Sequence, residues 1–197
     1  MEIKWHGQTC FSIKGKNAQV VINPHKGLKS KLKANVVMAA DEENYDTKQI
    51  EGLKPMPEEN PVPPKVFDWP GEYEASGVSV IAIPHADGGL MFRFEIDDIT
   101  FCHLGTMTDE PTEKQTEAIG DVDVLLVPSS KESLSGKKAH AVIEEIEPRI
   151  VIPMIGPFDE FLKELGKHDI EQAESYKIVS RTGLPEDKTD YILLTSS

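Results

Sequence analysis

Residues 36–46 read VVMAADEENYD and join an uninterrupted apolar run to a strongly acidic loop. The run from Val36 to Ala40 has no polar side chain, which is typical of a β-strand covered on both faces. A strand of this kind belongs in the interior of a layered protein. The segment therefore predicts an α/β protein built around this strand, with the acidic loop at the end of the strand.

Shorter β-rich runs precede this strand, and turn residues separate them. Gly7, the turn Gly15-Lys16-Asn17 and the pair Asn23-Pro24 stand between successive runs. We therefore expect several short strands in the first quarter of the chain. These runs cover residues 3–5, 10–13 and 20–22.

A change of composition marks residues 51–64, where five prolines accompany Glu58 and Glu59. Proline lacks the amide donor that helices and sheets need, so this stretch predicts an extended surface loop. The residues before it are too few for a separate core. We therefore expect a single domain over residues 1–197, with the loop as an excursion from it.

The second half of the sequence alternates strand-like and helical patterns. Thr112 and Gln115 have capping-box spacing at the start of one helical pattern, and Gly120 follows its end. The alternation predicts layered sheets flanked by helices. Strands are expected near residues 66–67, 78–83, 90–96, 99–104, 122–127, 150–152, 178–179 and 191–194, and helices near residues 112–119, 139–146 and 158–165.

The charge of the chain narrows the classes of partner. It carries 34 acidic and 21 basic residues, a formal net charge of -13. Nucleic-acid backbones and anionic membranes attract basic surfaces, so we expect neither as a partner. A homo-oligomer and an unknown protein partner both stay open.

Two cysteines, Cys10 and Cys102, each lie within an apolar, strand-like run. Isolated cysteines of this kind are typical of core residues in a reducing compartment. The sequence also lacks a signal-peptide pattern and an apolar run long enough to span a membrane. We therefore expect a cytoplasmic protein.

Six segments, taken in order, resemble the metallo-β-lactamase superfamily, and within it the small proteins related to ascorbate-phosphate lactonases. The first is similar to that branch's W-x-G-[HQ]-[ST]-x-F start, and the fourth stands where the family has His-x-Gly-Asp. The resemblance implies a four-layer αββα sandwich, the metallo-β-lactamase fold. The segments are WHGQTCFSIKG (5–15), VVINP (20–24), FDWPGEYEASGVSVIAIP (67–84), FCHLGT (101–106), GDVDVLLVP (120–128) and EPRIVIPMIGP (147–157).

The resemblance also identifies the positions at which the superfamily binds metal. Its signature H-x-H-x-D-H follows an early buried strand, and here the matching residues are DEENYD. Asp41 and Glu43 stand at the first two histidines, Tyr45 at the aspartate and Asp46 at the last histidine. None of these four positions keeps the family's residue.

The other ligand positions have also changed. The resemblance places His85 at the third histidine, Thr106 at the bridging aspartate and Ile155 at the final histidine. Isoleucine has no donor atom and threonine no charge, so a dinuclear zinc centre is not expected. His103, Tyr45 and Thr106 are further candidates for the mouth of the site.

Two hypotheses of function follow. The first is a non-catalytic or weakly catalytic homologue that serves binding or assembly and needs no cofactor. The second is a hydrolase of phosphodiesters, lactones or other esters that uses a single divalent cation, Zn²⁺, Mn²⁺ or Mg²⁺. Its ligands would be Asp41, Glu43, Asp46 and His85. Under the first hypothesis the acidic loop is simply a solvated, charged surface.

Overall fold

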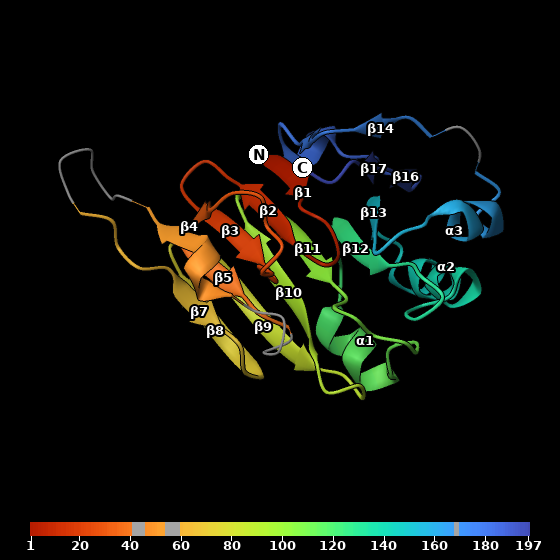
Figure 1. Cartoon of the computed structure of the whole chain (residues 1–197). Helices are drawn as coiled ribbons and strands as arrows, with labels where there is room; N and C mark the ends of the chain where they lie inside the picture. Colours follow the sequence, from red (N-terminus) through yellow and green to blue (C-terminus); the bar gives the residue numbers. More distant parts are fainter. Residues whose placement is uncertain (41–45, 54–59, 168–169) are drawn as a thin grey trace.

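A computed structural model describes residues 1–40, 46–53, 60–167 and 170–197 of the chain (Figure 1). Two β-sheets face each other, and helices pack on the outer face of one of them. The first sheet has six strands, and β3, β5 and β7 run parallel within it. Its order is β15 (Tyr176–Lys177), β1 (Glu2–Trp5), β2 (Phe11–Lys14), β3 (Gln19–Ile22), β5 (Val36–Met38) and β7 (Lys65–Phe67).

The second sheet has seven strands and is also mixed. The four of its strands that come first in the sequence form an antiparallel meander. The three later strands run parallel to the fourth strand of this meander. Its order is β16 (Asp190–Tyr191), β13 (Ile150–Met154), β12 (Val124–Pro128), β11 (Ile99–His103), β10 (Leu90–Ile96), β9 (Val78–Pro84) and β8 (Gly71–Ala75).

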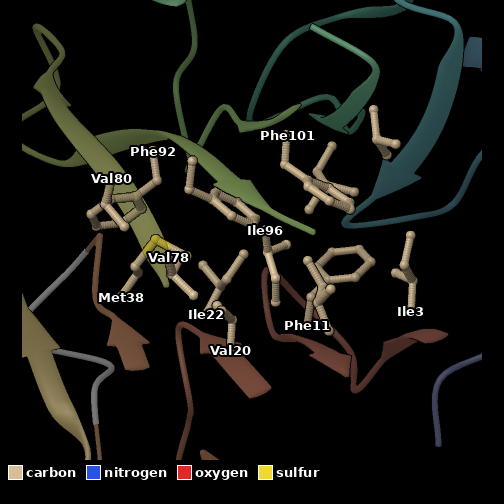
Figure 2. Close-up of a cluster of buried hydrophobic side chains, with 14 of the residues drawn as sticks. Ile3, Phe11, Val20, Ile22, Met38, Val78, Val80, Phe92, Ile96 and Phe101 are labelled. Atoms are coloured by element: carbon tan, nitrogen blue, oxygen red, sulfur yellow. The ribbon is translucent and has the colours of Figure 1, made fainter. Parts of the chain in front are cut away.

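The main core lies between the two sheets, and Figure 2 shows side chains from both of them meeting there. Each strand sends alternate residues into this layer because successive side chains on a strand point to opposite faces. Phe94 and Phe101, from neighbouring strands, stack with ring centroids 5.0 Å apart. Labelled members of this core are Ile3, Phe11, Val20, Ile22, Met38, Val78, Val80, Phe92, Ile96 and Phe101.

Helices α1 (Glu113–Ile119), α2 (Gly136–Ile146) and α3 (Asp159–Glu164) cover the other face of the seven-stranded sheet. The predicted capping box is confirmed, because the Thr112 hydroxyl accepts from the Gln115 amide while the Gln115 side chain accepts from the Thr112 amide. Gly120 ends α1 at a φ of 56°. α2 buries one apolar stripe, formed by Ala139, Val142, Ile143 and Ile146.

The outer face of the six-stranded sheet has a different cover. Its small apolar cluster centres on Cys10, Val21 and Val37. In the described part of the chain the covering elements are β4 (Leu32–Ala34), β6 (Ile50–Gly52) and a 3₁₀ helix at Thr47–Gln49, and none of them is an α-helix. The expected metallo-β-lactamase fold, α/β with two mixed sheets, is confirmed, with its outer layer on this side built mainly from short strands and loops.

The proline-rich excursion is paired at its base, contrary to the expectation of an unpaired loop throughout residues 51–64. β6 runs parallel to β4, and Leu53 and Val62 form an isolated β-bridge. The Val62 amide donates to the Leu53 carbonyl at 3.0 Å, which is possible because Val62, unlike its proline neighbours, retains an amide donor. The central residues 54–59 lie outside the described residues.

Three further findings complete the fold. Cys10 and Cys102 are free and buried, as expected of core residues. No helix among the residues described is long and apolar enough to cross a bilayer. The C-terminal part adds the pair β14 (Gln172–Ala173) and β17 (Leu193–Leu194) and a 3₁₀ turn at Arg181–Gly183.

Candidate functional site

A cleft of about 590 Å³ opens where β5, β7, β9 and β11 end. Each strand contributes the residues that directly follow its carboxyl end, because parallel strands deliver their carboxyl ends to the same edge of the layers. The lining residues are Ala39 and Ala40 after β5, residues 68–70 after β7, Pro84, His85 and residues 87–90 around the turn between β9 and β10, and Thr106 after β11.

Backbone hydrogen bonds join the two sheets at this cleft. The Leu90 amide of the second sheet donates at 3.0 Å to the carbonyl of Ala40, which follows β5 of the first sheet. Within the first sheet, the Ala39 amide donates to the Phe67 carbonyl at 3.1 Å and ties the end of β5 to β7. Asn23 strengthens the same corner, because its side-chain oxygen accepts from the Ala40 amide. The walls of the cleft are therefore held by main-chain bonding that does not depend on a ligand.

His85 lies in the wall of this cleft with only 2% of its side chain exposed. Neither ring nitrogen has a hydrogen-bond partner among the described residues, and Nδ1 lies 3.6 Å from the Asp87 carboxylate. Burial lowers the pKa of His85, and the negative charge of Asp87 acts against that shift. A neutral, buried imidazole without a hydrogen bond is costly, so it marks a position where a ligand atom would be favoured.

Glycine makes room for this imidazole. A Cβ atom added to Gly89 would lie 2.6 Å from Nε2 of His85, closer than real contacts allow. A Cβ atom at Gly105 would lie 3.4 Å from the same nitrogen, which is an ordinary van der Waals contact. The His85 ring therefore packs so closely on Gly89 that a larger residue there would displace it.

Asp87 holds a fixed carboxylate at the same turn. Its oxygens accept from the Thr108 amide at 3.0 Å and from the Thr108 hydroxyl at 3.1 Å. The backbone hydrogen bond from Thr108 is the largest cause that lowers the pKa of Asp87, and the hydroxyl adds to it. Asp87 therefore brings a negative charge to the cleft near neutral pH.

Asp68, Trp69 and Pro70 form the turn between β7 and β8 on another wall of the cleft. Trp69 is 67% exposed. The Tyr73 hydroxyl donates to the Trp69 carbonyl at 2.9 Å, and the Tyr73 ring stacks on Phe67 at 4.5 Å. A large aromatic face is thereby presented to solvent from a fixed turn.

The sequence-predicted site residues lie in different places. His85 and Thr106 line the same cleft. Asp41, Glu43 and Tyr45 lie outside the described residues. Asp46 directly precedes the 3₁₀ helix: its carboxylate accepts from the Lys48 amide, and its own amide donates to the Pro24 carbonyl at 2.8 Å.

His103 supports the cleft without lining it. The residue is fully buried, its Nε2 donates to the Thr9 carbonyl at 3.0 Å, and its Nδ1 accepts from the Gly105 amide at 3.1 Å. These partners assign the proton to Nε2 of a neutral ring. Burial lowers the pKa of His103 to about 4, and its ring packs edge-on against Phe11. The histidine therefore fixes the loop that carries Thr106.

Replacing Gly105 should destabilise this loop. Its φ of +64° strains any L side chain, and a Cβ atom would lie 2.6 Å from the Leu90 carbonyl oxygen, which belongs to the backbone and cannot rotate away. Gly105→Ala is expected to lower the free energy of unfolding by about 2 kcal/mol. Urea denaturation measures this, with Gly88→Ala as the control for positive φ alone, because a Cβ at Gly88 meets nothing within 4 Å. Equal stability of the two variants would contradict the steric explanation.

Ile155 lies apart from this cleft, in the loop after β13. Its φ of +61° is unusual for a β-branched residue. It lines a separate hollow of about 600 Å³ together with Ser129 and Phe161. The family's final ligand position therefore carries an aliphatic side chain that packs beside the hollow and offers no donor atom.

A pair of zinc ions does not fit these residues. Thr106 has no charge and Ile155 no donor atom, so at the described ligand positions only His85 and Asp46 have side chains that ligate metal well. The stretches 1–40, 46–53, 60–167 and 170–197 contain no group of three or more histidine, cysteine or acidic side chains placed to hold a metal ion. The acidic residues of 41–45 are outside those stretches.

Asp68, Trp69 and Asp87 were not expected as site residues from the sequence. The resemblance concerns the positions of the family's metal ligands, and these three residues are not among them. The signal in the sequence was Trp69 followed by Pro70-Gly71 just after a short strand, because a turn exposes its side chains. Their common location follows only from the arrangement of the strands.

The fold and the site define the class of protein. The chain belongs to the β-lactamase superfamily, because the sequence profile of the beta-lactamase superfamily domain matches residues 2–155. A protein from Thermotoga maritima, assigned as a Zn-dependent hydrolase of the metallo-β-lactamase superfamily, is similar over 99% of this chain and 100% of its own, with 25% identity and a TM-score of 0.81.

More distant solved structures share the fold. A protein assigned as a metal-dependent hydrolase from Parabacteroides distasonis matches with 14% identity and a TM-score of 0.62, over 83% of this chain and 87% of its own. The metallo hydrolase Igni18 from Ignicoccus hospitalis matches with 12% identity and a TM-score of 0.61, over 90% and 98%. A search among curated proteins finds no match.

Proposed function

We propose that this protein is a metallo-β-lactamase-fold binding protein that has lost zinc-dependent hydrolysis or retains it only weakly. The observation that carries this proposal is the chemistry of two ligand positions. Thr106 cannot supply the bridging carboxylate, and Ile155 cannot supply the final nitrogen. Hydrolysis in this superfamily relies on a metal-bound hydroxide, and a metal generates one only when enough protein ligands hold it.

The cleft itself supports a binding role. Its walls are joined by hydrogen bonds between Leu90 and Ala40 and between His103 and Thr9 that need no metal. The cleft keeps the buried imidazole of His85 and the carboxylate of Asp87 in its lining, and it is large enough for a small molecule. Loss of the metal ligands therefore leaves a formed site.

A hydrolase with one divalent cation is the second candidate, and His85 is the observation that favours it. Its unpartnered ring nitrogens suit a metal ligand, and the carboxylates of Asp41 and Glu43 follow Ala40 of the cleft in sequence. In this candidate Zn²⁺, Mn²⁺ or Mg²⁺ would provide a bound water as the nucleophile.

Metal content and hydrolysis measured together test the proposal. Protein purified without chelator should contain far less than one equivalent of metal by elemental mass spectrometry. Added Mn²⁺, Mg²⁺ or Zn²⁺ should raise neither its melting temperature nor its hydrolysis of phosphodiester, lactone and thioester substrates. The proposal fails if hydrolysis is found and is abolished in both His85→Ala and Asp41→Ala/Asp46→Ala, with Glu42→Ala as the matched loop control.

Partners and location belong to the same proposal. A net charge of -13 disfavours nucleic acids and anionic membranes, so small molecules or proteins are the expected partners. We place the protein in the cytoplasm on the basis of its two reduced, buried cysteines. Assembly as a homo-oligomer is compatible with this role.

A further inference from the structure

The electrostatic character of the cleft limits what can bind there. Its described lining includes the carboxylates of Asp68 and Asp87 and no lysine or arginine. The Lys138 ammonium pairs with Asp109 and donates to the Thr108 carbonyl at 3.1 Å. Its positive charge also acts on the Asp87 carboxylate and partly offsets the negative charge on that side of the cleft. A phosphate or carboxylate ligand would meet like charges here, whereas a cation would meet opposite ones.

The rim adds an aromatic surface. Trp69 belongs to the same turn as Asp68, and two-thirds of its surface is open to solvent. Indole is the side chain that attracts cations most strongly through its ring face. A hydrated metal ion gains little from such a face, because its first shell holds oxygen and nitrogen ligands. An organic cation gains from both the ring and the carboxylates.

The wall of the cleft supplies a further recognition element. His85 is buried in this wall, and neither of its ring nitrogens has a hydrogen-bond partner among the described residues, so the ring has an unused acceptor that a bound N–H group would satisfy. An N–H group is the complementary donor. Ammonium and guanidinium groups carry such donors, whereas quaternary ammonium groups do not.

We propose that this cleft binds a small organic cation, an alkyl ammonium or guanidinium compound, between the Trp69 indole and the Asp68 and Asp87 carboxylates. His85 accepts an N–H of the bound group. This inference rests on the proposed binding function, because a metal ion bound in the cleft would take the place of the organic cation. It names the class of ligand that the binding function uses.

Fluorescence locates the binding. The chain has two tryptophans, and Trp5 lies elsewhere, packed on Phe158 with its indole nitrogen bonded to the Gln8 carbonyl. In Trp5→Phe the emission therefore comes from Trp69 alone. Agmatine, which carries both an ammonium and a guanidinium group, should change this emission saturably in chelator-treated protein. The anion bis(4-nitrophenyl) phosphate should not change it.

Calorimetric titration of variants with agmatine shows which side chains bind the ligand. Asp68→Asn and Asp87→Asn should each weaken binding about tenfold, since a charge-assisted hydrogen bond is lost. Trp69→Ala should weaken it about fivefold. Glu74→Gln, which removes one charge from the exposed face of β8, should leave the affinity within about twofold, because screening limits distant charges. Circular dichroism verifies that Asp87→Asn, which loses its Thr108 contacts, is folded.

Each remaining outcome has a defined meaning. The inference is overturned if agmatine produces no heat and no emission change at millimolar concentration, or if Glu74→Gln weakens binding as much as Asp68→Asn. It is also overturned if Mn²⁺ binds at the cleft and agmatine does not. Hydrolysis that depends on metal, with agmatine binding intact, would instead defeat the proposed function and leave this inference standing.

Discussion

Asp123→Ala is expected to lower the free energy of unfolding by about 3 kcal/mol. The Asp123 side chain is 2% exposed and accepts from the Thr100 amide at 3.0 Å. It also pairs with Arg149 at 3.3 Å and with Arg181 at 3.2 Å. Alanine would leave a buried amide unsatisfied and would remove the only carboxylate shown between these two guanidinium groups.

Partial exposure of both arginines sets the size of this effect. Arg149 and Arg181 can turn to water, so the loss falls at the lower end of the range for a broken buried pair. Asp123→Asn keeps an acceptor for the Thr100 amide and should cost only about half as much. Urea denaturation of both variants measures the difference, with the exposed neighbour Asp121→Ala as a control that should change stability by less than about 0.5 kcal/mol. An Asp123→Ala variant with an unchanged free energy of unfolding would show that the ion pairs contribute nothing to stability.

The second large effect is a loss of stability on acidification that depends on His103. Burial holds the pKa of His103 near 4, whereas the unfolded chain keeps the ordinary value of 6.5. Below pH 6.5 the unfolded state therefore binds a proton that the folded state does not. The stabilisation is complete above pH 6.5, declines as pH falls, and is fully lost by about pH 4, a total of about 3 kcal/mol.

His103→Phe identifies the source of this loss. The variant should be less stable at pH 7, because the Thr9 carbonyl and the Gly105 amide lose their partner. Its stability should then fall less steeply between pH 6.5 and 4 than that of the original protein. His6 and His85 remain as contributors in the same direction, because burial lowers the pKa of His6 to about 4 and also lowers the pKa of His85. The partial exposure of His6 makes its share smaller. His140→Gln, on the helix surface, should leave the slope unchanged, and an unchanged slope in His103→Phe would contradict the assignment.

Local patterns predicted the elements of this fold well. The apolar run at Val36–Met38 is a strand buried on both faces, and Thr112 with Gln115 forms the expected capping box. Both depend on residues that are close in sequence. The short strands at Leu32–Ala34 and Ile50–Gly52 were not expected, because each is stabilised chiefly by pairing with the other.

The candidate site was predicted only in part, for a related reason. His85 and Thr106 were expected together from the resemblance, and they line one cleft. The contribution of Asp68 and Trp69 depends on how β7 and β8 are placed relative to the β9–β10 turn. The supporting role of His103 depends on Thr9, a partner 94 residues away. No local pattern contains such distant pairings, and the ligation predicted for Asp41 and Glu43 stays a prediction.

The pairing of β1 with β15 has a consequence for biosynthesis. Glu2 lies opposite Lys177, and the Met1 amino group donates to the Ile178 carbonyl. β1 is therefore synthesised long before the segment that bonds its outer edge, which is β15 together with Ile178. Until then the nascent protein has an open strand edge, which is where chains pair wrongly with one another. Folding of the six-stranded sheet should consequently be completed only after β15 has been synthesised, and chaperone contacts during synthesis should concentrate on this edge.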